Sequence, residues 1–545
     1  MDRILVVRAG DAVEVRDPAG SARVPADALP GLVAAREAGS RPVRWVWDDT
    51  TRWYPALLAR GVRVARCTDL RLCHAVLRRS PLVDQARLVA ADTPGWDALE
   101  PVTAVDAGLF PLADPADGLA PAAEDDRQQA ALAASAGRGP LALLLAAESS
   151  GALVAAEMTH TGLPWRADVH DRLLTAVLGP RPVAGGRPEL LERLAREVRR
   201  ELGAPGLNPD SPAELLRALR AAGLPVADTR SWTLEQLDHA ALPALLEYRR
   251  LARLMTANGW AWLDAWVREG RFRSWFLPGG VVTGRWASSG GGALSVPAQV
   301  RPAVIADEGW RFVVADVAQL EPRVLAGMSG DTAMARAALG ADLYEGMVAG
   351  GVVGTRAEAK IGMLGALYGG TRGESGRMLP RLARRYPRAI GLVEDAARAG
   401  ERGEVVRTLL GRGSPTPSAP GADPAGPDEP PDDGGRPEQD GRRRAWGRFT
   451  RNFVVQGTAA EWALCWLADL RNRLWELGEG PIEARPHLVF FLHNEVVVHT
   501  PEHLAVEVAE AVRQAAAAAG RLLFGGFPID FPLDVAVVRS WADAG

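Results

Sequence analysis

The stretch VVADVAQLEPRVLAGMSGD (residues 313–331) begins as an apolar run, ends that run at Asp316 and continues through a polar turn. The apolar residues favour a buried strand, and the residues after the turn favour a helix. A carboxylate at the end of a strand is well placed to hold a divalent cation. The same carboxylate could instead cap the helix that follows it.

A second strong strand signal lies in VFFLHNEVVVHTP (residues 489–501), where His493, Asn494 and Glu495 separate two apolar runs. This pattern predicts a hairpin whose turn presents polar groups at the edge of a sheet. Taken alone, His493 could equally be a histidine satisfied within the core. The other strong strand candidate is EGWRFVVAD (residues 308–316), which contains the first apolar run.

A helix is predicted over RAEAKIGMLGALYGG (residues 356–370), where Arg356, Lys360, Leu364 and Tyr368 recur every four residues along one face. The chain has 63 lysine and arginine residues, and only Lys360 is a lysine. An ammonium group can give up a proton or contact a phosphate oxygen as a point charge, which a guanidinium does poorly. Two cations and a ring on one face could bind a triphosphate and stack a base. An ordinary surface helix could show the same spacing.

Composition limits the possible partners and compartments. The net charge is −4, so a site for a polyanion must be a local arginine groove. The three cysteines, Cys67, Cys73 and Cys465, form no CxxC pair. We therefore expect neither a disulfide framework nor a zinc site, and a reducing compartment. We find no signal peptide and no apolar run that approaches the length of a membrane span. The bias toward Ala, Arg, Gly and Pro suggests a GC-rich bacterial genome.

The chain divides into regions of different pattern. Residues 1–100 alternate short apolar strands with helical stretches and predict a small α/β domain. Residues 124–275 are mostly helical. Residues 411–440 contain eight prolines and seven acidic residues, which predicts a flexible insertion. Further helices are expected at residues 331–349, 355–369, 375–400 and 455–476.

Three segments in this order resemble the motifs of the family A, or polymerase-I-like, DNA polymerases. Those motifs have the forms DYSQIELR, RxxxKxxxFxxxYG and VHDE. The corresponding segments here are DVAQLEPR (316–323), RAEAKIGMLGALYGG (356–370) and LHNE (492–495). Further matches are TGRWASS (283–289) and RFTRNFVVQGTAAE (448–461), and the resemblance runs in order over roughly residues 145–545.

The resemblance implies an α/β N-terminal domain that is exonuclease-like (RNase H-like) and an α+β right-hand polymerase domain. The first would span residues 1–140 and the second residues 141–545. Within the second, the implied parts are a thumb at about 170–275, a palm at about 280–330 and 445–545, fingers at about 331–410, and the insertion at 411–440.

The resemblance also implies a catalytic metal site. Asp316, the backbone carbonyl of Val317 and Asn494 would hold Mg²⁺, with Mn²⁺ as a possible substitute, and Glu495 would lie beside them. Lys360 would protonate the leaving pyrophosphate, so the implied catalytic residues are Asp316, Lys360, Asn494 and Glu495.

The remaining implied roles concern the nucleotide and the DNA. Glu321 would block a ribose 2′-hydroxyl by steric exclusion. The nucleotide-binding residues would be Arg356, Lys360, Leu364, Tyr368, Glu321 and His493. The residues contacting the minor groove of the primer-template would be Arg285, Arg448, Asn452 and Gln456, because the acceptors of that groove are nearly independent of sequence.

Several residues depart from the family pattern. Asn494 stands where the family has an aspartate, and Glu495 next to it is expected to point to the opposite face of its strand. Leu364 replaces an aromatic residue. In the N-terminal domain no D-x-E is found, Trp53 stands at a carboxylate position, and only Asp125 remains, with its alternative role a charge at a helix N-terminus.

We therefore expect a template-directed DNA polymerase that adds dNTPs to a primer 3′-hydroxyl, weakened by Asn494 and without proofreading. The protein would act as a monomer in the bacterial cytoplasm, at the nucleoid and without a membrane partner. One alternative is a primer-template-binding protein that has lost catalysis. A third is a nuclease that acts through Asp125.

Overall fold

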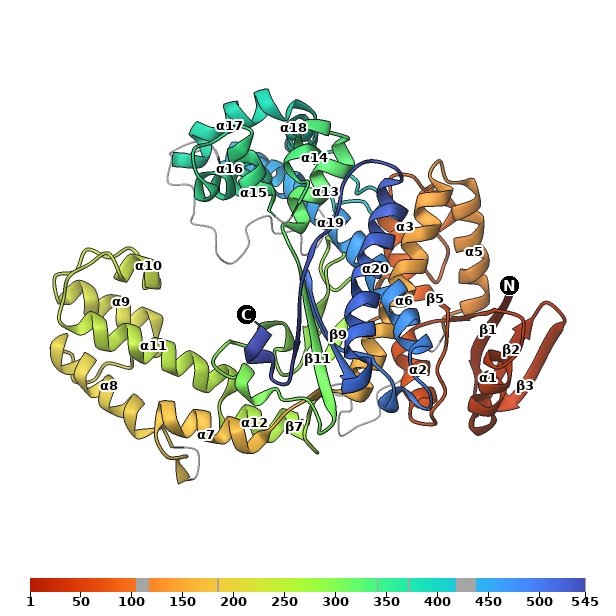
Figure 1. Cartoon of the computed structure of the whole chain (residues 1–545), viewed down its shortest axis with the longest axis horizontal. Helices are drawn as coiled ribbons and strands as arrows, with labels where there is room; N and C mark the ends of the chain where they lie inside the picture. The colour runs from red at the N-terminus through yellow and green to blue at the C-terminus, as the bar shows by residue number, and fades with distance from the viewer. Residues whose placement is uncertain are drawn as a thin grey trace. The chain divides into compact units, whose positions relative to one another are not determined.

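The computed structural model describes residues 1–103, 116, 118–183, 186–340, 342–370, 373–417 and 438–544. These residues form two compact units. Figure 1 labels their helices and strands and colours the chain by residue number. The first unit contains Met1–Thr161, Trp275–Gly290 and Glu308–Val538. The second contains Gly162–Ser274, Gly291–Asp307 and Arg539–Gly545.

The first unit opens with a five-stranded sheet in the order β3-β2-β1-β4-β5. The first three strands are antiparallel, and β1, β4 and β5 are parallel, which agrees with the predicted α/β pattern. The elements of this region are β1 (Asp2–Ala9), β2 (Ala12–Asp17), β3 (Gly20–Pro25), α1 (Leu29–Glu37), β4 (Val43–Trp47), α2 (Thr50–Leu58), β5 (Cys67–Asp69), α3 (Leu70–Arg79), α4 (Thr93–Asp97) and α5 (Pro121–Ala134).

Helix α6 (Arg138–Thr161) is the apolar helix that follows this region. By length and composition it could span a bilayer, which corrects the expectation that no apolar run approaches that length. Within the structure, 67% of its most apolar window is buried, as in the core helix of a folded domain. It packs against α2, β5 and the long helix α19 (Glu438–Glu476).

A four-stranded antiparallel sheet in the order β12-β13-β11-β14 forms the centre of the first unit. Its strands are β11 (Trp310–Val317), β12 (His487–Leu492), β13 (Glu495–Pro501) and β14 (Leu533–Val538). The predicted strand and hairpin are therefore present. Helices α19 and α20 (Ala505–Phe524) pack together and against this sheet (Figure 1). A short two-stranded sheet of β9 (Trp275–Leu277) and β10 (Ala287–Ser289) contacts α6 through β9.

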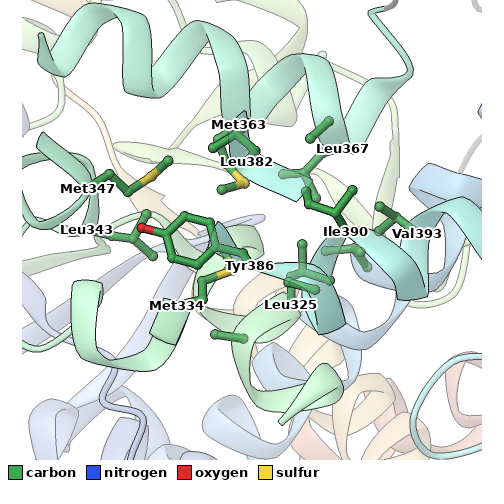
Figure 2. Close-up of a cluster of buried hydrophobic side chains, with 14 of the residues drawn as sticks. Leu325, Met334, Leu343, Met347, Met363, Leu367, Leu382, Tyr386, Ile390 and Val393 are labelled. Carbon is green, nitrogen blue, oxygen red and sulfur yellow. The ribbon is translucent and has the colours of Figure 1, made fainter. Parts of the chain in front are cut away.

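Six helices between β11 and α19 share one apolar core, drawn in Figure 2. Met363 and Leu367 come from one helix, Met347 from a second and Ile390 from a third, and Tyr386 lies among them. The helices are α13 (Leu320–Ser329), α14 (Thr332–Ala337), α15 (Leu343–Ala349), α16 (Arg356–Tyr368), α17 (Gly373–Arg385) and α18 (Pro387–Glu401).

Three helix predictions need correction. The helix expected at 331–349 is interrupted near Gly340, whose φ of 95° lies in the left-handed region. The helix expected at 375–400 breaks before Pro387, because proline removes a backbone donor and disfavours helix at the preceding residue. Helix α19 begins at Glu438 rather than at residue 455.

The predicted insertion at 411–440 lies mostly outside the described residues, which exclude 418–437. Its ends are ordered. Arg412 is buried and pairs with Glu148 of α6, and Leu410 N donates to Glu461 Oε2 of α19 at 3.0 Å. The insertion therefore starts after these contacts and not at residue 411.

The second unit is largely helical, as predicted. Ser211 caps α9 (Pro212–Ala221) by accepting a hydrogen bond from Glu214 N. Trp165, His170, Trp262 and Phe272 form an aromatic cluster. The elements are β6 (Leu163–Pro164), α7 (Ala167–Leu178), α8 (Glu189–Glu201), α9 (Pro212–Ala221), α10 (Ser231–Leu234), α11 (Ala241–Asn258), α12 (Trp260–Trp266), β7 (Val267–Arg268) and β8 (Arg271–Phe272).

A buried ion pair joins the N-terminal region to α6 and α19. Arg471 Nε donates to Glu157 Oε2 at 2.8 Å, and Arg471 Nη2 donates to Glu157 Oε1 at 2.6 Å. The Tyr54 hydroxyl also donates to Glu157 Oε1 at 2.6 Å. Burial alone would raise the pKa of Glu157, but Arg471, together with Arg63 and the Tyr54 hydroxyl, outweighs burial and holds that pKa below its usual range. The pair is therefore charged and satisfied.

Replacement of Arg471 by Met should destabilise the protein by about 3–5 kcal/mol, because Glu157 would be left buried without its partner. The matched control is Arg473→Met on the same helix, whose partly exposed pair with Asp469 should contribute about 1 kcal/mol or less. Urea unfolding followed by tryptophan fluorescence measures both. Equal effects of the two substitutions would contradict the role assigned to the buried pair.

Candidate catalytic and nucleotide-binding site

Strand pairing sets the surroundings of Asp316. In the register of β11 with its two neighbours, Asp316 lies opposite Glu495 of β13 and opposite Asp534 of β14. Residues opposite one another in antiparallel strands project from the same face of the sheet. The three carboxylates therefore form a row, and Glu495 faces the same side as Asp316.

The turn between β12 and β13 brings Asn494 to the same carboxylate. His493 adopts a left-handed backbone conformation with φ of 55°, and the chain reverses there. Asn494 Nδ2 lies 2.9 Å from Asp316 Oδ1, 2.8 Å from Asp316 Oδ2 and 3.4 Å from the carbonyl oxygen of Val317. Since Asn494 belongs to the turn, the alternation expected along a continuous strand does not separate it from Glu495.

The carboxyl group of Asp316 has a raised pKa. The residue is exposed as a whole, but nearby protein atoms partly desolvate its carboxylate. This desolvation, together with the charges of Glu495 and Asp534, raises the pKa to about 6, although the hydrogen bond from Asn494 opposes the shift. A bound cation would relieve this concentration of negative charge.

The groups around Asp316 offer a suitable set of oxygen ligands for a hard cation only if the Asn494 amide is one of the ligands. No group of three His, Cys, Asp or Glu side chains among the described residues is arranged to hold a metal ion. The groups that converge are the Asp316 carboxylate, the Val317 carbonyl and the Asn494 amide, which presents its Nδ2 to the other two. Rotation of the amide would exchange its donor nitrogen for the acceptor Oδ1, an oxygen ligand of the type that Mg²⁺ binds.

Helix α16 carries the predicted stripe on its exposed face. Arg356, Lys360, Leu364 and Tyr368 are all exposed, while Met363 on the other face is buried in the core of Figure 2. The helix is fixed at both ends. Thr355 and Glu358 form a capping box at its start, and Gly369 ends it in the left-handed conformation.

Four predicted residues from different segments form one hydrogen-bonded chain. Arg285 pairs with Glu321 Oε1, and the Tyr368 hydroxyl donates to Glu321 Oε2 at 3.0 Å. The side chain of Gln456 hydrogen-bonds Tyr368. Glu321 lies in the first turn of α13, where Pro322 is tolerated because the first helical residues need no intrahelical donor. The chain links α13, α16 and α19.

A cavity of about 220 Å³ lies beside this chain and beside Asn494. It has room for a sugar-sized group, since one liquid water occupies about 30 Å³. Burial, aided by the charge of Arg285, lowers the pKa of His493 to about 4, so its imidazole is neutral near pH 7. The side chains considered below that line the cavity are Arg285, Glu321, Tyr344, Leu364, His493 and Asn494.

The other predicted DNA-binding residues follow one side of α19. Arg448, Asn452 and Gln456 are four residues apart and partly exposed, so they share a face. Gly369 lies against this face, since a Cβ there would come 2.7 Å from Arg448 Cγ. The end of α16 and the polar face of α19 therefore adjoin.

Sequence reasoning missed Asp534, Tyr344 and Gln319. Asp534 stands in LDVAVV, a weak strand whose pairing with β11 no local pattern reveals. Tyr344 and Gln319 line the cavity. No sequence pattern pointed to Tyr344, whereas Gln319 belongs to the segment DVAQLEPR (316–323), which was the available signal.

The two residues considered in the N-terminal region, Asp125 and Trp53, are both engaged by other side chains. Asp125 of α5 forms an ion pair with Arg3 of β1. Trp53 is buried and donates through Nε1 to Asp48 Oδ1 at 2.5 Å. Asp125 is thus neutralised by a cation of the chain itself.

Comparisons with known proteins agree on one family. The family profile described as DNA polymerase family A matches residues 188–543. The thermostable DNA polymerase I of Thermus filiformis is 29% identical over 400 residues, covering 65% of this chain and 44% of that protein. That of Thermus aquaticus is 28% identical over 393 residues, covering 64% and 43%. The chain thus spans less than half the length of these relatives.

A solved structure shares the fold. The POL domain of Pol1 from M. smegmatis, in complex with DNA primer-template and dNTP, superposes with a TM-score of 0.69. The match covers 100% of this chain and 96% of that chain at 18% sequence identity.

Cation binding at Asp316 should weaken as the pH falls through 6, because a proton competes for the same carboxylate. Affinity for Mn²⁺ should be nearly constant above pH 7 and should fall about tenfold per pH unit well below 6. Titration of free Mn²⁺ by electron paramagnetic resonance between pH 5 and 8 measures this.

The control for this titration is Asp534→Asn. Removal of a neighbouring negative charge should lower the pKa of Asp316 and move the transition to lower pH. A wild-type affinity that does not change between pH 5 and 7 would contradict the assignment.

Proposed function

Since the chain belongs to DNA polymerase family A, we propose that it catalyses template-directed transfer of deoxynucleotides to a primer 3′-hydroxyl. The observation that carries the proposal is the convergence of Asp316 and Asn494 beside a cavity lined by Glu321 and Leu364. These residues come from three segments that are distant in the sequence, since Asp316 and Glu321 share the first, Leu364 belongs to α16 and Asn494 to the hairpin, so their meeting is a property of the fold.

The proposal assigns a part of a right hand to each region. The sheet of β11–β14 with α19 and α20 is the palm, and the core of α13–α18 is the fingers. The second compact unit, centred on α7–α12, is the thumb. The N-terminal sheet region is the exonuclease-like domain. In this division the fingers contain the exposed face of α16 and the palm contains Asp316.

Asp316, the Val317 carbonyl and Asn494 would hold Mg²⁺ or Mn²⁺ in the proposed site. When bound, the cation supplies Lewis-acid activation of the primer hydroxyl and neutralises phosphate charge. Asp316 contributes the negative charge of this set. The uncharged amide of Asn494 contributes one ligand oxygen and no charge, which weakens the site.

The exposed face of α16 would bind the incoming nucleotide. Arg356 presents a forked donor to phosphate oxygens, and Lys360 presents a point charge that can transfer a proton to the leaving pyrophosphate. Glu321 occupies the wall of the cavity and would exclude a ribose 2′-hydroxyl. Arg285 and Tyr368 hold the Glu321 carboxylate in place from two sides.

The face of α19 that carries Arg448, Asn452 and Gln456 would contact the primer-template. Its donors suit the minor groove, where purine N3 and pyrimidine O2 are acceptors in every base pair. Binding through such donors is nearly independent of sequence. Arg285 would join this surface from the segment before β10.

One observation favours a second candidate, a primer-template-binding protein without catalysis. Asn494 donates to both oxygens of Asp316, so in this arrangement the amide satisfies the carboxylate that a cation would need. The nuclease alternative has less support, because Arg3 neutralises Asp125. We propose that the N-terminal domain does not proofread.

Replacement of Asn494 by Asp should raise the rate of primer extension by about 10²-fold or more, because it restores a negative charge to the cation site. Extension of a labelled primer with Mg²⁺ and with Mn²⁺ measures the rate. Asp316→Ala should abolish extension. The matched control is Asn472→Asp, the same chemical change at an exposed position of α19. Absence of extension by wild type, with extension by Asn494→Asp, would instead identify a lapsed catalyst.

Replacement of Glu321 by Ala should admit ribonucleotides. The ratio of kcat/KM for dNTP to that for rNTP should fall about tenfold or more, since the steric block is removed. The ratio is informative even if overall activity drops through loss of the bonds to Arg285 and Tyr368. Glu308→Ala, at an exposed position before β11, is the control. An unchanged ratio would remove Glu321 from sugar selection.

A further inference from the structure

The guanidinium of Arg356 is held from two directions by a segment that the sequence did not single out. Its Nε and its Nη2 each lie 2.8 Å from Oδ2 of Asp342. Its Cζ lies 5.7 Å from the centroid of the Tyr344 ring. A carboxylate on one edge and a ring beside it restrict a side chain that would otherwise sample many rotamers.

The carboxylate of Asp342 is itself fixed. Its Oδ1 accepts hydrogen bonds from Tyr344 N at 2.8 Å and from Glu345 N at 3.1 Å, so it caps α15. Oδ2 is the oxygen left for Arg356. Each oxygen of this side chain therefore has its own partner, and the direction of the carboxylate is set by the helix that it caps.

The segment is also tied to the turn that follows Asp316. Gln319 Oε1 accepts a hydrogen bond from Leu343 N at 3.2 Å. Arg323, fully buried in α13, donates to the carbonyl oxygens of Ala338 at 2.6 Å and Gly340 at 3.0 Å. The residues that hold Arg356 are therefore anchored to the turn and the helix that directly follow Asp316.

Arg356 keeps donors available in this arrangement. A guanidinium has five N–H groups, and the contacts with Asp342 use one on Nε and one on Nη2. The side chain remains 49% exposed. The three other N–H groups can therefore reach a phosphate while the pair with Asp342 persists.

We propose that Asp342 is a positioning residue that holds Arg356 in the conformation in which it receives the triphosphate of the incoming nucleotide. This inference rests on the proposed function. The Tyr344 ring supports the same conformation from the cavity wall. Asp342 acts through Arg356 and does not touch the nucleotide.

The test uses substitutions that separate the charge of Asp342 from its capping role. Asn and Ser are both good N-caps, so Asp342→Asn and Asp342→Ser keep acceptors for the α15 backbone but remove the ion pair. The dissociation constant of the correct dNTP is measured on primer-template with a dideoxy-terminated primer, from the fluorescence of a 2-aminopurine in the template. It should rise about five- to fifty-fold in both variants. In extension assays KM should rise while kcat changes little.

Two comparisons make the result specific. In an Arg356→Ala background, Asp342→Asn should have no further effect, because it acts only through the arginine. Asp395→Asn removes the partner of Arg398 at an exposed position of α18 and should leave dNTP affinity unchanged. Circular dichroism of each variant checks folding, and the Ser variant decides if the Asn variant does not fold.

An unchanged or tighter dNTP affinity in the folded Asp342 variant would overturn the inference, and tighter binding would mean that Asp342 competes with the triphosphate. An equal loss in the Arg356→Ala background would also overturn it. If wild type binds no dNTP on primer-template, the proposed function fails and the inference with it. If wild type binds dNTP and Asp342 has no influence, only the inference fails.

Discussion

The register of β11 between β13 and β14 is the constraint on which the candidate site depends. It places Asp316 opposite Glu495 on one side and Asp534 on the other. Because side chains alternate along a strand, a slip of one residue would turn Asp316 away from its neighbours. Apolar residues such as Val313 and Val497, fully buried in the sheet, oppose that slip. The polar row is therefore held in place by the apolar residues of the same strands.

Helix α16 is held in place by its buried face and by its two capped ends. Met363 and Leu367 are fully buried in the shared core, while the opposite face is exposed and carries cations and a ring. Burial of side chains of this size contributes roughly 1.5–3 kcal/mol each. The capping box at Thr355 and the left-handed Gly369 fix where the helix starts and stops. Together these features place the exposed stripe.

Much of this arrangement could be predicted from local patterns. The stripe from Arg356 to Tyr368 follows from a spacing of four, and the hairpin around Asn494 follows from polar residues between apolar runs. Such signals are carried within about ten residues. The family could also be recognised from the sequence, because its motifs occur in the expected order in separate segments.

Features that depend on strand pairing or on the local backbone conformation could not be predicted from the sequence. Asp534 meets Asp316 only through strand order. Glu495 was expected on the wrong face, because the left-handed conformation of His493 could not be foreseen. The break at Gly340 creates the turn that Asp342 follows, and the sequence pattern there favoured an unbroken helix. The partners of Arg356 therefore came from the structure alone.

The exposed position of the only lysine has a practical consequence. Apart from the α-amino group of the chain, Lys360 is the one aliphatic amine of the molecule, and it lies on the exposed face of α16. Reagents that acylate amines meet a single side chain, so a cross-linker or resin that couples through lysine would attach the protein by the helix that carries the proposed nucleotide-binding residues. Coupling chemistry for sensors or immobilised preparations would have to use another functional group.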